Sequence, residues 1–376
     1  MAIRTVGFPR PHQEPGEVRD FPPSVTEFLA QFDLDAIVLE DGYGTRQGLS
    51  PADYTHPKIK YGAVSDCYAQ DLVVTLRCPR PDKFAMLRPG STLLSMLHFP
   101  TRPDRVRLCE SMQIIGVAMD QVADDLGRRV IENLEAVGFN GVKIGMHRLA
   151  TTWADFASPS RRPLQVTVLG AGAVGAHAVR AAVRYGDDAV RAELRAKQVP
   201  GVEVTSVDVE LTTSPDYLLK RLAVTDLLVD ATQRRDTTQV IVRNEWLAHL
   251  PEHAVIVDLS VDPYDFTRDP PGVKGVEGIP QGSLDQYVFA REDPAWDAID
   301  PRVPHAVRRS VVSCYSWPGI DPAACMRVYG KQIEPVLRAL IEKGPDKLRA
   351  VGGPWMERAT ARAMHRHFLP QTETTS

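Results

Sequence analysis

The amino-acid sequence predicts an α/β protein that contains two parallel β-sheets. Its 376 residues are enough for two domains of ordinary size. Short apolar runs alternate with helix-like runs over residues 1–140, at a spacing typical of a parallel sheet. A second series of apolar runs begins at residue 166. Its later members are rich in Val, Leu and Ile without alternation, as in strands that are covered on both faces.

The expected elements follow in chain order. In the N-terminal part we expect strands over residues 3–8, 36–40, 71–77, 91–98 and 114–120, and helices over residues 24–32 and 128–139. After a linker rich in Ser, Pro and Arg we expect strands over residues 166–169, 202–208, 225–231 and 254–262, and helices from residue 176 and over residues 329–342.

The most specific local signal is the glycine pattern that follows the predicted strand at Val166–Leu169. In a strand–turn–helix unit, the first glycine allows a tight turn, the second lets the backbone approach a pyrophosphate, and the third lets the helix pack against the strand. The helix N-terminus adds N–H donors and a positive dipole. The alternative is an ordinary turn between a strand and a helix. We predict a dinucleotide site with the cofactor-binding residues Gly170, Gly172, Ala173, Val174 and Gly175.

Composition narrows the class of protein. The net charge is -4, so nothing indicates nucleic acid or an anionic membrane as a partner. No apolar stretch approaches the ~20 residues of a membrane span, and the N-terminus lacks the apolar region of a signal peptide. The five cysteines form no metal-ligand spacing. We expect free thiols, a cytoplasmic protein and no bound metal.

Further motifs occur in a characteristic order. They are Val6-Gly7-x-Pro9, Glu17-Val18-Arg19, Leu72-Val-Val-Thr-Leu-Arg77-x-Pro79 with His98 21 residues after Arg77, and Val255-Ile-Val-Asp258-Leu-Ser-Val-Asp262. Together with the glycine pattern, they resemble the alanine dehydrogenase and nicotinamide-nucleotide transhydrogenase family. That family also includes saccharopine dehydrogenases and carboxyethyl-amino-acid synthases. The resemblance covers most of the chain.

The resemblance implies two Rossmann-like domains. A discontinuous substrate domain would comprise residues 1–140 plus 318–376, with an NAD(P)-binding domain over residues 141–317 inserted into it. The active site would lie in the cleft between the domains, where the strand ends of two α/β units face a shared crevice.

Two residues are the candidate proton carriers. His98 ends a predicted apolar strand, where a neutral imidazole can hydrogen-bond a substrate carbonyl and move its proton. The resemblance makes Asp262, at the end of the predicted strand 254–262, the second acid–base group. Asp258 is its rival, although we expect it to lie deeper in the sheet. Asp120 also follows a predicted strand and could line the cleft.

Two arginines are the candidate substrate-binding residues. The resemblance implies that Arg19 grips the substrate carboxylate, for which a guanidinium offers a planar fork. Arg77 stands where the family has a lysine that contacts substrate and assists proton transfer. Arginine stays protonated, so Arg77 can bind a carboxylate or polarise a carbonyl but cannot act as a base. This departure favours a substrate bulkier than alanine.

Asp208 is the candidate ribose ligand. It closes the predicted strand after the glycine pattern, where a carboxylate takes the adenosine hydroxyls and repels a 2′-phosphate. The separation of 33 residues from Gly175 exceeds the usual roughly 20, and an insertion over residues 187–201 explains it. The residue type favours NAD without excluding NADP.

These features lead to one leading hypothesis and two alternatives. The leading one is an NAD(P)-dependent oxidoreductase acting on the C–N bond of an amino acid, in the manner of alanine dehydrogenase. The alternatives are an opine- or saccharopine-type dehydrogenase, which condenses an amino acid with a 2-oxo acid, and a nucleotide-binding sensor without catalysis. In each case the partner is a small amino acid or 2-oxo acid, and we expect a homo-oligomer.

Overall fold

The computed structural model describes residues 2–11, 17–234 and 236–369. The chain divides into two compact units, of which unit 1 comprises residues 1–133 and 321–376 and unit 2 comprises residues 134–320. The sequence placed these boundaries at 140/141 and 317/318, so the observed ones differ by a few residues at each crossing.

Unit 1 is built on a six-stranded sheet among its described residues, in the order β3-β2-β1-β4-β5-β6, with every neighbouring pair parallel. The strands are β1 (Thr5–Phe8), β2 (Ala36–Glu40), β3 (Ile59–Gly62), β4 (Leu72–Arg77), β5 (Thr92–Met96) and β6 (Ile115–Ala118). The α-helices are α1 (Pro23–Leu29), α2 (Val64–Tyr68), α3 (Pro81–Phe84), α4 (Pro103–Ser111), α10 (Pro322–Lys343) and α11 (Trp355–Arg362).

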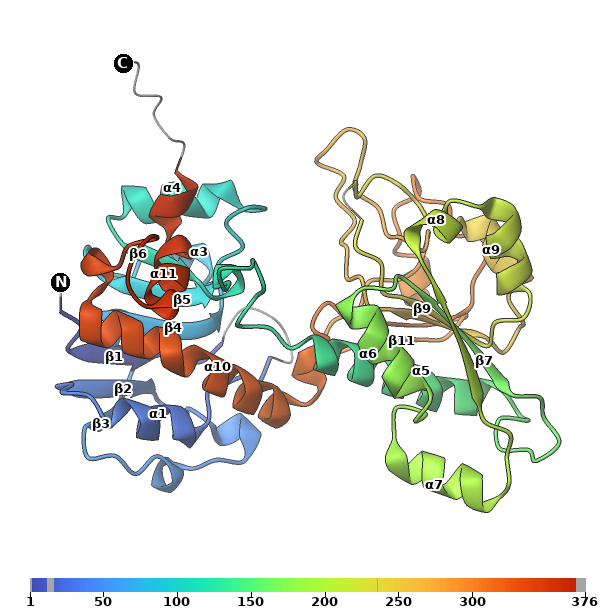
Figure 1. The fold of residues 1–376 in the computed structure, drawn as a ribbon, viewed down its shortest axis with the longest axis horizontal. Helices are drawn as coiled ribbons and strands as arrows, with labels where there is room; N and C mark the ends of the chain where they lie inside the picture. Colours follow the sequence, from blue (N-terminus) through green and yellow to red (C-terminus); the bar gives the residue numbers. More distant parts are fainter. Residues whose placement is uncertain (1, 12–16, 235, 370–376) are drawn as a thin grey trace. The chain divides into compact units, whose positions relative to one another are not determined.

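The helices of unit 1 cover both faces of its sheet (Figure 1). Along β4, the alternate residues Leu72, Val74 and Leu76 pack in the same apolar cluster as α1, α10 and α11. Val73 points the other way and packs with α3 and α4. Because successive strand residues face opposite sides, a run that is apolar throughout needs two such layers.

Unit 2 carries the second sheet, in the order β11-β12-β10-β9-β7-β8 over its described residues. Its neighbouring strands are parallel except for the antiparallel pair β11 and β12. The strands are β7 (Leu164–Leu169), β8 (Val202–Val207), β9 (Leu227–Asp230), β10 (Val255–Asp258), β11 (Val288–Phe289) and β12 (Ser310–Ser313). The α-helices are α5 (Leu134–Thr152), α6 (Ala173–Ala182), α7 (Asp188–Ala196), α8 (Val209–Thr212) and α9 (Pro215–Leu222).

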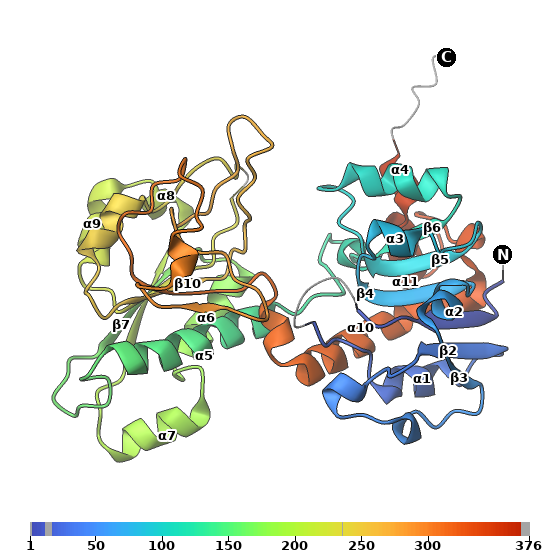
Figure 2. The same ribbon diagram turned by 180° about the vertical axis from the view of Figure 1, so that it is seen from behind.

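The two faces of the unit 2 sheet are covered differently. Helices α5 and α6 pack on one face, where Gly141 leaves room for Leu259: a Cβ at this glycine would lie 2.2 Å from the leucine side chain. The other face is covered by α9 and by irregular segments between residues 231 and 309. Figure 2 shows these segments from behind. The sheet therefore has both faces buried, as its strands without alternation predict.

Each sheet has one point at which the chain switches direction across it. In unit 1 the chain moves outward from β1 to β2 and β3, then returns to β4 on the other side of β1. In unit 2 it moves from β7 to β8 and returns to β9 on the other side of β7. Ligands of open α/β sheets bind at the carboxyl ends of the strands beside this switch point. The topology thus indicates the ends of β1 and β4 in unit 1, and of β7 and β9 in unit 2.

The prediction of an α/β fold with two mainly parallel sheets is confirmed. Individual elements differ. The helix expected over residues 128–139 begins only at Leu134 and continues to Thr152. Before it, the Asp124 carboxylate accepts hydrogen bonds from the N–H groups of Leu126 and Arg128, and Val130 N–H bonds back to Val122. This side-chain bonding holds a turn in place of a helix.

The strand expected over residues 254–262 was also placed wrongly, because β10 ends at Asp258. The Asp258 carboxylate accepts hydrogen bonds from the Ser260 hydroxyl and the Val261 N–H, and Val261 has a positive φ of 60°. The chain therefore turns back on the end of its own strand. Asp262 lies beyond that turn and does not end a strand.

Candidate functional site

The glycine turn of unit 2 has two positions at which a side chain does not fit. Gly170 follows β7 with φ +98°, and a Cβ there would lie 2.6 Å from the Ala231 carbonyl oxygen. A Cβ on Gly175 would lie 2.0 Å from the Gly170 carbonyl oxygen. Both glycines are required by the close approach of β7, β9 and α6.

The middle glycine of the turn is different. Gly172 is exposed, and a Cβ placed on it would meet no atom within 4 Å. It precedes α6 without a side-chain cap, and the first N–H groups of any α-helix lack partners within the helix. Ala173 and Val174 supply such groups beside open space. This is the arrangement that a diphosphate needs at a helix N-terminus, so the residues present fit a dinucleotide.

Asp208 lies beside the glycine turn. Strands β7 and β8 pair in register from Leu164 with Val202 to Leu169 with Val207, and the Gly170 N–H donates to the Val207 carbonyl at 2.8 Å. Asp208 is the next residue, is exposed and caps α8 by accepting from the Leu211 N–H at 3.1 Å. The long separation from the glycines is occupied by α7.

In unit 1, His98 is held by an aspartate. The strand expected over residues 91–98 ends at Met96, and His98 follows in a turn with φ +50°. Its N–H donates to Asp120 Oδ1 at 3.0 Å, and its Nδ1 lies 3.4 Å from Asp120 Oδ2. The His98 side chain is 48% exposed, whereas that of Asp120 is 3% exposed. The backbone and ring are thus fixed while one edge of the imidazole stays open.

The charge of Asp120 follows from this contact. Burial by itself would raise the pKa of the Asp120 carboxyl, but the hydrogen bonds and positive charge of His98, with a hydrogen bond from Gln121, lower the pKa to about 2. Asp120 is therefore ionised at neutral pH. An ionised carboxylate at Nδ1 orients the ring and favours a proton on that nitrogen, which leaves the other nitrogen to exchange a proton with a ligand.

Arg19 is buried rather than open. It forms an ion pair with Glu17, which is itself fully buried, and a hydrogen bond with the Cys325 thiol of α10. Burial raises the pKa of the Tyr329 phenol, and the positive charges of Arg19 and Arg77 oppose that rise. Arg19 and Arg77 are therefore both close enough to Tyr329 of α10 to act on it electrostatically.

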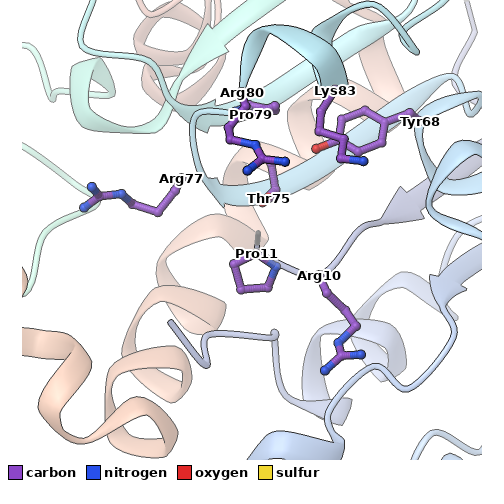
Figure 3. Close-up of a pocket in the computed structure, with 8 residues that line it drawn as sticks. All are labelled: Arg10, Pro11, Tyr68, Thr75, Arg77, Pro79, Arg80 and Lys83. Atoms are coloured by element: carbon purple, nitrogen blue, oxygen red, sulfur yellow. The ribbon is translucent and has the colours of Figure 1, made fainter. Parts of the chain in front are cut away.

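Arg77 ends β4 and borders a small pocket at the switch point of unit 1. The pocket has about 220 Å³ of space outside the protein atoms, part of it open to solvent. Figure 3 shows its lining, in which the Arg77 side chain extends to one side. The lining residues are Arg10, Pro11, Tyr68, Thr75, Arg77, Pro79, Arg80 and Lys83. The basic side chains at positions 10, 80 and 83 were not singled out from the sequence. A signal for them is present in the arginines and lysine that directly follow β1 and β4.

Asp258 and Asp262 have different surroundings in unit 2. Asp258 is buried, and Lys274 Nζ lies 2.7 Å from its Oδ2. Burial would raise the pKa of Asp258, but the charge and hydrogen bond of Lys274 lower it. Asp262 is 25% exposed and pairs with Arg234 at 2.7 Å. Of the two candidates, Asp258 is occupied by structural contacts, and Asp262 is the one that reaches the surface.

Asp230 is a second buried carboxyl that the sequence analysis did not single out. It ends β9 directly opposite Asp258 in the sheet register. Burial, together with the charge of Asp258, raises the pKa of Asp230 to about 6. The Thr232 N–H and hydroxyl donate to it at 3.1 and 2.7 Å. Two carboxylates ending two neighbouring apolar strands were a signal for this pair.

Each unit therefore holds some of the predicted site residues. Unit 2 places Asp208 beside the glycine turn, and Asp262 follows the end of β10. Unit 1 places Arg77, His98 and Asp120 at or just after the carboxyl ends of β4, β5 and β6.

Among the described residues, no group of three His, Cys, Asp or Glu side chains could hold a metal ion. The helices found there include none with the length and apolarity needed to cross a membrane.

Comparison with curated proteins identifies two distant relatives. The chain is 21% identical over 241 residues to the alanine dehydrogenase of Geobacillus stearothermophilus, covering 60% of this chain and 64% of that protein. It is 22% identical over 238 residues to the alanine dehydrogenase of Bacillus subtilis (strain 168), covering 60% and 62%. The matched stretch thus spans less than two thirds of the length of these relatives.

Solved structures share the fold over a greater length. An L-alanine dehydrogenase superposes with a TM-score of 0.71 at 17% identity, covering 96% of this chain and 94% of that one. A transhydrogenase from Sinorhizobium meliloti gives 0.64 at 16% identity, covering 90% and 94%.

Two family models match parts of the chain that contain most of the motifs described in the sequence analysis. The model for the alanine dehydrogenase/PNT N-terminal domain matches residues 18–135, and that for the C-terminal domain matches residues 152–263. Together they cover more than half of the chain. The resemblance found in the motifs is confirmed, and the chain belongs to the alanine dehydrogenase/PNT family.

Proposed function

We propose that this protein is an NAD(P)-dependent oxidoreductase that acts on the C–N bond of an amino acid, in the manner of alanine dehydrogenase. The observation that carries the proposal is the glycine turn of unit 2. Contacts exclude a side chain at its two outer glycines, whereas the middle one opens onto space beside free helix amides. The name of the curated relatives, alanine dehydrogenase, supports the amino-acid part.

The cofactor would be held by unit 2. The N-terminal amides of α6, at Ala173, Val174 and Gly175, would bind the diphosphate, and Asp208 would accept hydrogen bonds from the adenosine ribose. A carboxylate at this position repels a 2′-phosphate and favours NAD. When bound, the nicotinamide supplies or accepts the hydride.

The substrate would be held by unit 1. Arg77 would bind its carboxylate through charge-assisted hydrogen bonds. The Arg19 guanidinium is buried in an ion pair with Glu17 and would have to leave that pair to bind the same carboxylate. His98 would give or take the proton at the substrate heteroatom, with Asp120 holding the ring in one tautomer. Asp262 would be the second proton carrier. Its ion pair with Arg234 would have to open for that role.

The identity of the amine separates the dehydrogenase from an opine- or saccharopine-type enzyme. Both would use the same proton carriers, and they differ in whether ammonia or an amino acid condenses with the 2-oxo acid. The arginine at position 77, where the family has lysine, favours the larger substrate. It also supports a second candidate function, a sensor that binds nucleotide without turnover, because arginine cannot act as a base.

The test is NADH oxidation by the full chain with a panel of 2-oxo acids, each with ammonia and with amino acids. We expect turnover with at least one pair and a preference for NADH over NADPH. Tight NADH binding with no turnover across the panel would favour the sensor. If calorimetry detects no binding of either nucleotide, the proposal is wrong at its first step.

A further inference from the structure

The turn that leads from β10 to Asp262 is joined at both ends by a single lysine. Lys274 Nζ donates hydrogen bonds to Asp258 Oδ2 at 2.7 Å and to the backbone carbonyl of Asp262 at 3.1 Å. The side chains of Lys274 and Asp258 are each 1% exposed. One buried ammonium therefore connects the last residue of β10 with the residue that the proposed function makes the second proton carrier.

From these contacts we infer that Lys274 is a positioning residue for Asp262. It holds the backbone of the turn, so that Asp262 keeps its place when its ion pair with Arg234 opens. The inference rests on the proposed function, in which Asp262 carries a proton, and deepens it by naming the residue that fixes this group. In this role Lys274 acts through Asp262 and does not itself exchange a proton.

The contacts of Asp258 show what the lysine adds. Oδ1 of Asp258 accepts from the Ser260 hydroxyl at 3.0 Å and from the Val261 N–H at 3.2 Å, and its Oδ2 accepts from the Ser313 hydroxyl at 2.9 Å. Three donors other than the lysine therefore reach this carboxylate. Burying an ion pair costs desolvation, and apolar replacements of such pairs are often neutral or stabilising. Beyond balancing the charge of Asp258, the lysine adds the link to the Asp262 carbonyl.

The backbone of the turn needs such a link. Val261 has a φ of +60°, which is unfavourable for a β-branched residue. A strained conformation of this kind persists only where the surrounding structure fixes it. Lys274 contacts the chain on both sides of Val261, at Asp258 before it and at Asp262 after it. The lysine is thus placed to hold the strained residue.

The segment that carries Lys274 is itself anchored. On one side of the lysine, the Val273 N–H donates to the Thr237 carbonyl at 2.8 Å. On the other side, the Gly275 carbonyl accepts from the N–H groups of residues 241 and 242 at 2.9 and 3.0 Å. A side chain can fix a functional group only if its own backbone is held, and these bonds meet that condition.

Arg234 makes a different contact with Asp262. Its guanidinium lies 2.7 Å from Asp262 Oδ2 and also donates to the backbone carbonyls of Gln239 and Val273. This contact holds the carboxylate, whereas that of Lys274 holds the backbone. Asp262 is the more exposed member of the ion pair. The carboxylate can therefore leave Arg234 while the turn stays fixed by Lys274.

The first test requires no turnover. In the variant Lys274→Met, amide hydrogen exchange measured by mass spectrometry should become roughly tenfold faster over residues 259–263, relative to the rest of unit 2. The matched control is Arg309→Met, which removes another buried cation of unit 2 that donates to backbone carbonyls, those of Ala248 and Leu250. In this control, exchange over residues 259–263 should stay within about twofold of the unaltered protein.

The second test shows whether the lysine acts through Asp262. Lys274→Met should lower kcat roughly 10–100-fold and leave NADH affinity within about twofold. In the Asp262→Asn background the same substitution should change kcat by less than about twofold, because residues that act as a unit are not additive. Arg309→Met should leave kcat within about twofold of the unaltered protein, since it does not contact the turn.

A second variant guards against a failure to fold. Lys274→Met leaves the Asp258 carboxylate buried without its cation, so the double variant Asp258→Asn with Lys274→Met is made in parallel. It has no unpaired charge at this position, and asparagine keeps an oxygen for the bonds from Ser260 and Val261. Thermal unfolding shows which variants fold, and the same rise in exchange and fall in kcat are expected from either.

Three results would overturn the inference. These are unchanged exchange over residues 259–263 in both variants that lack Lys274, an equal rise in Arg309→Met, and additive losses of kcat from Lys274→Met and Asp262→Asn. The proposed function fails separately: if exchange rises at the turn but no pair of 2-oxo acid and amine supports NADH oxidation, Lys274 fixes the turn and the assignment as a dehydrogenase is wrong.

Discussion

The two sheets of this protein share a doubly wound plan but present opposite chemistry at their switch points. In unit 2 the chain leaves β7 through Gly170 and Gly172 and enters α6, whose first N–H groups lack partners within the helix. In unit 1 the chain leaves β1 through Pro9-Arg10-Pro11, and prolines also follow β4 at positions 79 and 81. Proline has no N–H, so these turns offer fewer backbone donors and depend more on side chains.

This difference separates what each unit can bind. Backbone amides at a helix N-terminus donate hydrogen bonds to the diphosphate of a large cofactor that must approach the chain closely. Arginine, lysine and histidine side chains reach outward and can select among small substrates by charge and proton transfer. The same fold thus supports two tasks through the residue types in its turns.

The largest expected effect is the loss of turnover on substituting His98. This substitution should impair proton transfer in unit 1 without changing nucleotide binding in unit 2. The variant His98→Asn should lower turnover by roughly 10²–10⁴-fold and leave NADH affinity unchanged. Asparagine is the better choice because it tolerates the positive φ of this residue, where alanine would add strain. Steady-state kinetics and NADH titration check both parts. Unchanged turnover would falsify the role of His98.

Two buried carboxyls, Asp230 of unit 2 and Asp120 of unit 1, should respond to pH with opposite signs. In unit 2 the pKa of Asp230 is raised to about 6, so the stability that this group contributes is present below its unfolded pKa of ~3.9 and is lost as pH rises through 6. The variant Asp230→Asn should therefore be more stable than the unaltered protein at pH 8, by on the order of 2 kcal/mol, with little advantage at pH 4. Urea unfolding at both values measures this. An equal difference at both pH values contradicts it.

In unit 1 the pKa of Asp120 is lowered to about 2, so its contribution is present above ~3.9 and is lost as pH falls through 2. The variant Asp120→Asn should lose on the order of 2 kcal/mol near neutral pH and should show a weaker loss of stability between pH 4 and pH 2. Unfolding curves recorded across that interval compare the two proteins. If both proteins lose the same stability between pH 4 and pH 2, Asp120 is not the cause of the acid response.

Two glycine substitutions should distinguish an effect on stability, through packing, from an effect on cofactor affinity in unit 2. Gly175→Ala forces a Cβ to within 2.0 Å of a carbonyl oxygen and should cost about 1–3 kcal/mol of stability. Gly172→Ala meets nothing in the protein, so stability should change by less than about 0.5 kcal/mol while NADH affinity falls roughly tenfold. Thermal unfolding and NADH titration of both variants test the contrast. Normal NADH affinity in Gly172→Ala would place the diphosphate elsewhere.

The smallest expected effect is at Asp208. Asparagine preserves the cap on α8, so Asp208→Asn should fold normally. NADH affinity should fall roughly tenfold, and discrimination against NADPH should weaken because the repelling charge is gone. Competition between the two nucleotides measures the change. If the preference does not move, another residue contacts the ribose.

Much of the fold could be predicted because it depends on local patterns. The strand at 36–40 was predicted with its observed bounds, and the glycine turn lies between β7 and α6 as expected. Apolar runs, glycines and helix-start residues act within a few positions of themselves, so the sequence alone indicates them. Asp262 was misplaced at a strand end because its turn is made by a hydrogen bond from Val261 back to Asp258, which the apolar pattern does not reveal.

The sequence by itself determined the two-sheet α/β plan, the glycine turn and the residue types available at each strand end. Only the tertiary structure decided which of them meet: His98 with Asp120, and Asp258 with Lys274. Charge and proton affinity depend on burial and on partners brought together by folding, and residues distant in the chain carry no local sign of that proximity.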